Sequence, residues 1–150
     1  MKLQDLKKEI PFKWRVQSSN QWGASCVAYI DSRQAQDLLD EVCGQTGWQV
    51  KFEEHKGNLF ASVGIKFGEE WIWKSDCGSE SNMEKEKGEA SDSFKRACVM
   101  WGIGRFLYSK KIVKLPVKEK NKKFIPFSEK TQKFVTSSEM ITQWCNALSK

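Results

Sequence analysis

The basic side chains between residues 87 and 105 are the first candidates for a binding site in this 150-residue chain. At 3.6 residues per helical turn, Lys95 and Arg96 lie on either flank of the face opposite Phe94, so both can reach solvent while an apolar stripe is buried. Asp92 precedes Arg96 by four residues, a spacing that allows an ion pair within a helix. Such fixed cations attract phosphate groups, although a solvated helix face would have the same composition.

A second group of cations lies in one lysine-rich stretch, which carries the surplus positive charge of the chain. The formal net charge is +6; residues 1–109 carry 15 basic and 16 acidic side chains, and residues 110–123 carry seven lysines and one glutamate. Such a run is either a solvated connector or an arm that attracts an anionic partner. The candidates for a secondary contact with that partner are Lys118, Lys120, Lys122 and Lys123.

Other kinds of site are disfavoured by the composition. His55 is the single histidine, and the sequence lacks the GxxxxGK(S/T) loop that binds nucleotide phosphates. A histidine-rich metal site and a Ser-His-Asp triad built elsewhere in the chain are therefore largely excluded. We predict that the protein is not an enzyme, has no catalytic residue, binds no metal and needs no cofactor.

The cysteines and the apolar residues indicate a cytoplasmic protein. The five cysteines are far apart in the sequence, which argues against a zinc ribbon or a disulfide framework and predicts reduced thiols. The first residues lack the apolar run of a signal peptide, and no run of about 18 apolar residues is present to span a membrane. We therefore expect no membrane partner.

An α+β fold is predicted from the hydrophobic periodicity. Residues 48–74 alternate in three short runs separated by turns, as in an antiparallel meander, and a helix over about 84–101 would cover its apolar face. Asp31 or Ser32 would cap an earlier helix that ends at Gly44. The remaining expected elements are a short amphipathic helix over residues 1–11, strands over 12–16 and 24–30, and a last helix from residue 137.

Most of the large apolar side chains are assigned to the core of this fold. The predicted buried stripe of the long helix consists of Ala90, Phe94, Ala97, Cys98 and Trp101. Tryptophans such as Trp48, Trp71 and Trp73 could stack on nucleic-acid bases, but core packing is the favoured interpretation. The stripe of the last helix, which includes Ile141 and Cys145, either docks on its own domain or receives another protein.

Several segments, in this order and at similar spacing, resemble the Rad52/Rad22 family of single-strand annealing recombination proteins. They are VAYIDSR at 27–33, LDEV at 39–42 with GW at 47–48, KGEASDSFKR at 87–96 and GIGRFLY at 102–108. The resemblance covers roughly residues 12–116. It is greater to the compact phage and bacterial members, the Sak and DdrA types, than to the eukaryotic one.

The resemblance implies a β-β-β-α core that assembles into a homo-oligomeric ring or arc, with single-stranded DNA in a basic groove around the outside. Phosphates would face the protein and bases would face outward, so that complementary strands anneal without ATP in homologous recombination and DNA repair. Residues 1–116 would bind DNA and form the oligomer, and residues 117–150 would be a lysine-rich connector with a C-terminal helix. A further partner would be a single-strand-binding protein or an exonuclease.

The DNA-binding residues are carried over one at a time from this resemblance. Lys95 and Arg96 match the Lys-Arg pair on the groove floor. Arg33 falls within one residue of a groove arginine, and Lys87 matches a lysine at the start of the same long helix.

The end of the long helix adds one candidate and one departure. Gly102 and Gly104 would break the helix and present Arg105 on the following turn, so Arg105 joins the predicted DNA-binding residues. Val99 stands where the eukaryotic pattern has a further basic residue, one turn beyond the Lys-Arg pair. This difference affects the expected path of the DNA.

Two other functions stay open. A protective binder of DNA ends would bind single strands without annealing them. A metal-dependent nuclease would combine Asp76 with the acidic-x-Lys pattern in residues 84–87. That chemistry normally places its carboxylates on adjacent strands, whereas residues 84–87 are predicted to begin a helix.

Overall fold

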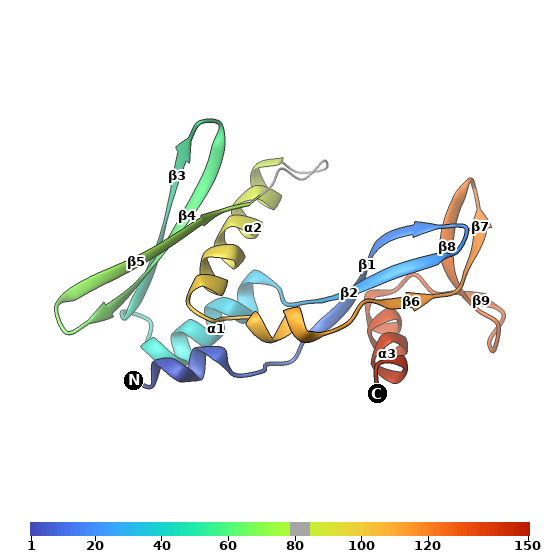
Figure 1. The fold of residues 1–150 in the computed structure, drawn as a ribbon, viewed down its shortest axis with the longest axis horizontal. Helices are drawn as coiled ribbons and strands as arrows, with labels where there is room; N and C mark the ends of the chain where they lie inside the picture. The colour runs from blue at the N-terminus through green and yellow to red at the C-terminus, as the bar shows by residue number, and fades with distance from the viewer. Residues whose placement is uncertain (79–84) are drawn as a thin grey trace. The chain divides into compact units, whose positions relative to one another are not determined.

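The computed structural model describes residues 1–78 and 85–150, which form two compact units. One unit consists of Met1–Ile10 and Ile30–Phe106, and the other consists of Pro11–Tyr29 and Leu107–Lys150. The fold is α+β, as predicted: the described residues form three antiparallel sheets of three strands each and three α-helices (Figure 1). No helix in this part of the chain is long and apolar enough to cross a membrane.

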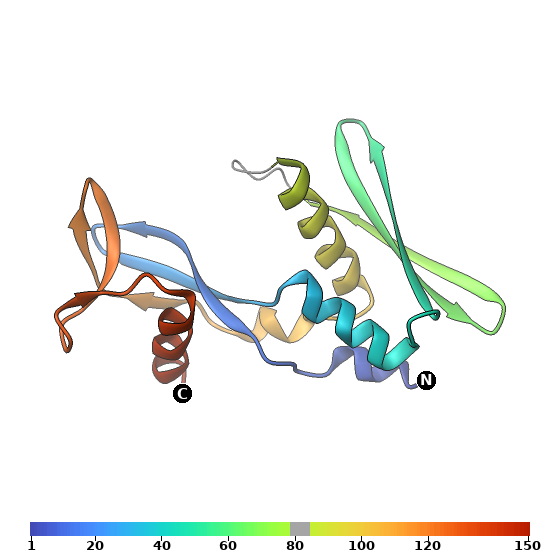
Figure 2. The same ribbon diagram turned by 180° about the vertical axis from the view of Figure 1, so that it is seen from behind.

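The first unit contains a meander of three strands and two α-helices. The strands are β3 (Trp48–His55), β4 (Asn58–Phe67) and β5 (Glu70–Cys77), and the helices are α1 (Ser32–Cys43) and α2 (Lys85–Met100). One 3-10 helix, Leu3–Lys7, packs beside α1, and another, Arg105–Ser109, follows α2. Figure 2 shows this unit from behind, with α2 beside the meander.

The start and end of α1 lie where the capping residues predict them. The Asp31 carboxylate accepts a hydrogen bond from the backbone N–H of Gln34 at 2.9 Å, and the Gln34 side chain accepts one from the backbone N–H of Asp31 at 3.0 Å. This reciprocal capping box satisfies two N–H groups at the helix start. Gly44 follows the last residue of α1 at φ 79°, a conformation that favours glycine. The predicted bounds of this helix are confirmed.

One face of the meander is covered by α2, as the apolar stripe predicts. The buried side chains are Ala61, Val63 and Ile65 on β4, Phe94, Ala97 and Cys98 on α2, and Trp101 directly after it. Ala90, the first residue of the predicted stripe, is only partly buried. The indole N–H of Trp101 donates to the Val63 carbonyl at 2.9 Å, so the end of the helix is bonded to the middle strand. Burial raises the pKa of the Cys98 thiol to about 12, and this cysteine therefore packs as a small neutral side chain.

Ser93 is a fully buried polar residue that ties α2 to the meander. Its hydroxyl oxygen lies 2.8 Å from the Leu59 carbonyl oxygen and 2.7 Å from the Glu89 carbonyl oxygen, and it accepts a hydrogen bond from the Gly78 N–H at 3.0 Å. The Glu89 carboxylate accepts a second bond from the backbone N–H of Leu59 at 2.9 Å. These contacts fix the position of α2 along the strands as well as its rotation.

The expectation that Trp71 and Trp73 pack in the core is wrong. In the register of β4 and β5, Trp71 lies opposite Lys66 and Trp73 lies opposite Gly64, and these positions alternate with those that face α2. Both tryptophans are partly exposed on the sheet face that α2 does not cover. Trp101, in contrast, is buried as predicted.

The second unit contains two sheets and a C-terminal helix. One sheet has the order β1 (Lys13–Asn20), β2 (Gly23–Tyr29), β6 (Val113–Leu115), and the other has the order β7 (Val117–Lys120), β8 (Lys123–Ser128), β9 (Lys133–Phe134). The helix is α3 (Ser138–Leu148). β1 extends beyond the strand predicted over residues 12–16, because it continues past an irregularity between Val16 and Ser18.

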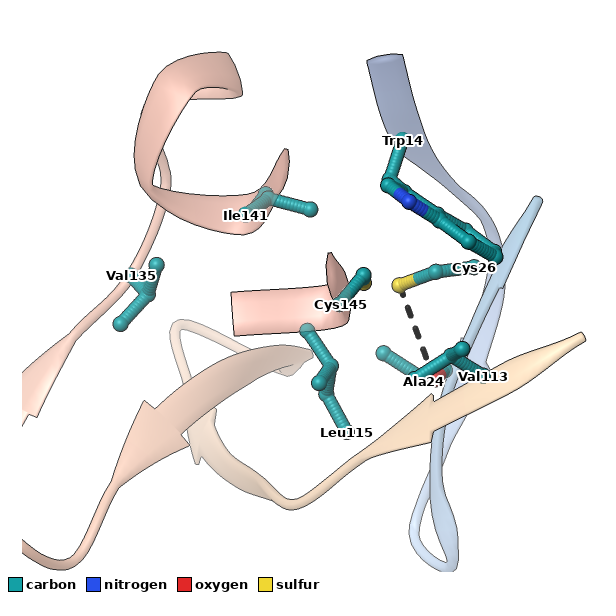
Figure 3. Packing of buried hydrophobic residues seen from close by; sticks show 8 residues of the cluster. All are labelled: Trp14, Ala24, Cys26, Val113, Leu115, Val135, Ile141 and Cys145. Carbon is teal, nitrogen blue, oxygen red and sulfur yellow. Dashed lines mark hydrogen bonds between the residues drawn. The ribbon is translucent and has the colours of Figure 1, made fainter. Parts of the chain in front are cut away.

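The C-terminal helix docks on the sheet of its own unit. Its buried side chains Ile141 and Cys145 lie in one apolar cluster with Trp14 (Figure 3). The backbone N–H of Trp14 donates to the Thr142 hydroxyl at 3.0 Å, and its indole N–H donates to the Asn146 side-chain oxygen at 2.8 Å. Of the two predicted roles for this helix, docking on its own domain is confirmed.

The lysine-rich stretch is folded into strands. β6 pairs with β2, and residues 117–128 form the hairpin of β7 and β8. Val113 and Leu115 are buried, with the exposed Lys114 between them, so the alternation of a strand is present in the sequence. The sequence analysis did not recognise this alternation, because lysines are so frequent in the stretch.

We expect Ser93→Ala to destabilise the protein by about 1–3 kcal/mol, because it removes a buried hydroxyl and leaves the Gly78 N–H without that partner. Chemical denaturation followed by circular dichroism measures the change. Ser75→Ala is the matched control: the Ser75 hydroxyl bonds Ser62 on the exposed sheet face, so its loss should cost less than about 0.5 kcal/mol. Equal stability of the two variants would contradict the role given to Ser93.

Candidate nucleic-acid interface

Two polar contacts hold the first turn of α1 against the middle of α2. The hydroxyls of Ser32 and Ser91 are hydrogen-bonded at 2.6 Å, and the Lys95 ammonium lies 3.5 Å from the Ile30 carbonyl oxygen. Arg33 is exposed and follows Ser32 in the sequence, so it lies at this junction. The structure therefore brings the start of α1, which carries Arg33, beside the segment of α2 that carries Lys95, 62 positions further along the chain.

Arg96 is exposed and is oriented by an ion pair within α2. Its Nε donates to the Asp92 carboxylate at 3.1 Å, which confirms the pair predicted from the four-residue spacing. An exposed pair of this kind contributes little stability, but it restricts the direction of the guanidinium. A planar guanidinium with five N–H donors is suited to contact a phosphate group.

Lys95 is less exposed than the sequence analysis expected. Its side chain is partly buried, and its ammonium reaches the Ile30 carbonyl, just before the start of α1. The Lys-Arg pair is thus divided between two settings: Lys95 lies in the α1–α2 junction, and Arg96 projects into solvent from the next position.

A second group of cations lies at the C-terminal end of α2. Gly102 and Gly104 have φ of 101° and 81°, so the chain turns there as predicted. The guanidinium of Arg105 then returns to the helix and donates to the carbonyls of Val99 and Met100, each at 2.9 Å. Helix C-termini carry partial negative charge and unpaired carbonyls, so this arrangement caps α2.

Lys74 is a basic residue at this end of α2 that the sequence analysis missed. Its ammonium lies 3.4 Å from the Met100 carbonyl oxygen and 4.4 Å from the centre of the Trp101 ring. Lys74 belongs to β5, so only the packing of α2 on the meander brings it beside Arg105. No local sequence pattern indicates this contact.

Two groups of predicted residues lie elsewhere. Lys87 is in the first turn of α2, but its side chain lies outside the described part of the structure. The four lysines of the secondary contact lie in the second unit, in or next to the β7–β8 hairpin: Lys118, Lys120, Lys122 and Lys123.

The hairpin lysines lie close to aromatic rings. The Lys118 ammonium is 4.2 Å from the centre of the Phe127 ring, and the Lys120 ammonium is 5.0 Å from that of Phe134. Lys122, at φ 63°, is in the turn between the two strands. The hairpin therefore presents positive charges at fixed positions.

The residues of the nuclease alternative can be placed only in part. The Asp76 carboxylate, on β5, accepts a hydrogen bond from the backbone N–H of Cys77 at 2.8 Å. Glu84 lies outside the described residues. Within residues 1–78 and 85–150, no group of three or more His, Cys, Asp or Glu side chains is placed to hold a metal ion.

The structure is that of an α+β protein in which a long helix, carrying Lys95 and Arg96, covers one face of an antiparallel meander. Comparison with known proteins assigns it: the chain belongs to the family described as "Rad52/22 family double-strand break repair protein", whose sequence model matches residues 1–64 and 56–124. The resemblance identified from the sequence is confirmed.

Two curated relatives are named "Single-stranded DNA-binding protein DdrA". The one from Deinococcus radiodurans is 34% identical over 119 residues, which is 72% of this chain and 57% of the relative. The one from Deinococcus deserti is also 34% identical over 119 residues, 72% of this chain and 59% of the relative. The chain thus spans somewhat more than half the length of these relatives. No solved structure matches the chain.

We expect Arg105→Met to lower the free energy of unfolding by about 1 kcal/mol, because the Val99 and Met100 carbonyls each lose one hydrogen bond and keep those from the Gly102 N–H and the Lys74 ammonium. Arg105→Lys keeps the charge but not the two-point geometry, and should recover only part of this loss. Lys111→Met, at an exposed position, is the control for loss of one charge. Denaturant titration at low salt measures all three; an Arg105→Met protein as stable as the control would contradict the capping role.

Proposed function

We propose that this protein binds single-stranded DNA and anneals complementary strands without ATP, in DNA repair by homologous recombination. The observation that carries the proposal is the α1–α2 junction, where the start of α1, which carries Arg33, packs beside the segment of α2 that carries Lys95 and Arg96, and where Asp92 orients the guanidinium of Arg96. Membership of the Rad52/22 family and the names of the two DdrA relatives support it.

Annealing depends mainly on cations held at fixed positions. Two strands pair only when the repulsion between their phosphates is screened, and lysine or arginine side chains at fixed positions provide that screening while counterions are released. The phosphates would lie along α2 from the α1–α2 junction toward Arg105, with the bases directed outward. The proposal needs no catalytic residue.

Assembly into a homo-oligomeric ring or arc is part of the proposal. β3 and β5 are the outer strands of the meander, and each has eight residues. Strand edges of this length are places where other chains pair unless something covers them. Neighbouring subunits would cover them and would join the basic helices into one continuous path for DNA.

The first prediction from this proposal concerns the groove. We expect Lys95→Ala with Arg96→Ala to weaken binding to oligo-dT and to reduce the salt dependence of the binding constant by about 0.7 per lost phosphate contact. Fluorescence anisotropy from low to physiological salt measures both quantities.

The control removes the same charge from another part of the chain. Lys130→Ala with Lys150→Ala changes two exposed lysines of the second unit and should leave the salt dependence nearly unchanged. A double variant at 95 and 96 that keeps the parent's affinity and slope would contradict the groove. Normal binding by the parent without faster annealing of complementary oligonucleotides would instead favour the protective binder of DNA ends.

The second prediction concerns assembly. Light scattering at micromolar concentration, with and without single-stranded DNA, should give a mass many times 17.3 kDa. The reason is that the long strand edges of the meander would pair or be covered in the oligomer. A mass of one chain under both conditions would count against annealing by a ring or arc.

The third prediction concerns the hairpin lysines, proposed here as a secondary DNA contact. Replacing Lys118, Lys120, Lys122 and Lys123 with glutamine should slow association and annealing at low salt. The effect should shrink at physiological ionic strength, where the Debye length is about 8 Å. Stopped-flow measurements at the two salt concentrations test this; rates equal to the parent's at low salt would show that the hairpin does not attract DNA.

A further inference from the structure

The sheet face that α2 leaves uncovered carries an aromatic surface built around Gly64. The indole of Trp73 lies flat against this glycine: a Cβ added at position 64 would be 2.8 Å from the ring. Glycine weakens a strand interior, and its presence there often marks a close approach by another group. Here the missing side chain allows the ring of Trp73 to lie on the backbone of the middle strand.

Two further side chains extend this surface. The ring centres of Trp71 and Trp73 are 6.2 Å apart and their planes are inclined by 31°. The ammonium of Lys51, from β3, lies 4.3 Å from the centre of the Trp73 ring. All three strands of the meander therefore contribute to one patch, which we define as Lys51, Gly64, Lys66, Trp71 and Trp73.

The charges of this patch favour an anionic occupant. Lys51 and Lys66 are its charged members, and Lys66 lies directly opposite Trp71 in the register. On the same sheet face, Glu53 is bonded to His55 at 3.0 Å, toward the other end of the strand. A partly exposed tryptophan pair flanked by lysines on a rigid sheet combines the two features that non-specific single-strand binding uses, stacking and positive charge.

We propose that this patch is a second contact for single-stranded DNA, which holds bases by stacking, whereas the face of α2 holds phosphates. The inference rests on the proposed function and adds a site to it. A base would stack on the tryptophan pair and displace the Lys51 ammonium from the Trp73 ring, so that the ammonium meets the adjacent phosphate. Such a contact tolerates any sequence, because every base has a π-face.

The first experiment separates stacking from charge. Oligo-dT and an abasic oligonucleotide of the same length have the same phosphates, but only the first has bases. Trp71→Leu and Trp73→Leu should each weaken binding of oligo-dT by about fivefold or more, the equivalent of about 1 kcal/mol for one stacked base, and should leave the abasic strand unaffected. Phe52→Leu, at an aromatic residue 45% exposed on the opposite face, is the matched control.

The second experiment does not depend on the folding of any variant. Oligo-dT containing 5-iodouracil is irradiated with the parent protein, and the crosslinked peptides are identified by mass spectrometry. Crosslinks at Trp71 or Trp73 support the proposal. Crosslinks confined to other residues overturn it, as do tryptophan variants that bind oligo-dT like the parent.

Failure of this inference can be told apart from failure of the proposed function. If the parent binds oligo-dT and the abasic strand equally well, and both depend on Lys95 and Arg96, then the groove stands and the stacking patch is wrong. If the parent binds neither strand, both are wrong. Tryptophan variants with a lower mass in light scattering and unchanged binding would reassign the patch to a contact between two copies of the chain.

Discussion

The burial of one face of α2 against β4 and β5 determines where every described basic side chain of that helix is directed. Apolar contacts alone would allow the helix to slide or rotate, but Ser93 fixes both through its bonds to Leu59 and Gly78. With that face fixed, Lys95 is directed to the Ile30 carbonyl just before α1, and Arg96 to solvent. The directions of these two cations are therefore a consequence of core packing on the other side of the same helix.

Aromatic rings hold cations in place throughout this protein. Six cation–aromatic pairs occur among the described residues, where a chain of this length would be expected to have about two. They are Arg15–Tyr29, Lys51–Trp73, Lys74–Trp101, Lys110–Phe12, Lys118–Phe127 and Lys120–Phe134. A lysine that rests on a ring has fewer accessible rotamers, so its charge is presented at a defined place. The near-neutral balance of residues 1–109 is thus compatible with strongly basic local surfaces.

Local patterns predicted most elements of residues 1–101 and the C-terminal helix, but they missed the strands β6 to β9 and the long-range contacts. The cap at Asp31 and the Asp92–Arg96 pair depend on neighbours three or four residues away, and both are confirmed. The orientation of Trp71 and Trp73 could not be inferred in the same way, because residues 71–73 are all apolar and either face of β5 could have been the buried one. The register with β4 decides which face meets α2. The alternation of Val113, Lys114 and Leu115 in β6 was present in the sequence, but the surrounding lysines led to its interpretation as a connector or arm.

The end of α2 shows how a charge can be supplied from another part of the chain. Position 99 is apolar, so sequence comparison alone suggests a gap in the basic face one turn beyond Lys95 and Arg96. Two glycines reverse the chain after the helix, and the guanidinium of Arg105 then bonds the Val99 carbonyl itself. Lys74 adds a second cation from a different strand. A positive face is therefore a property of the folded surface, and a missing lysine or arginine at one aligned position does not imply a missing charge there.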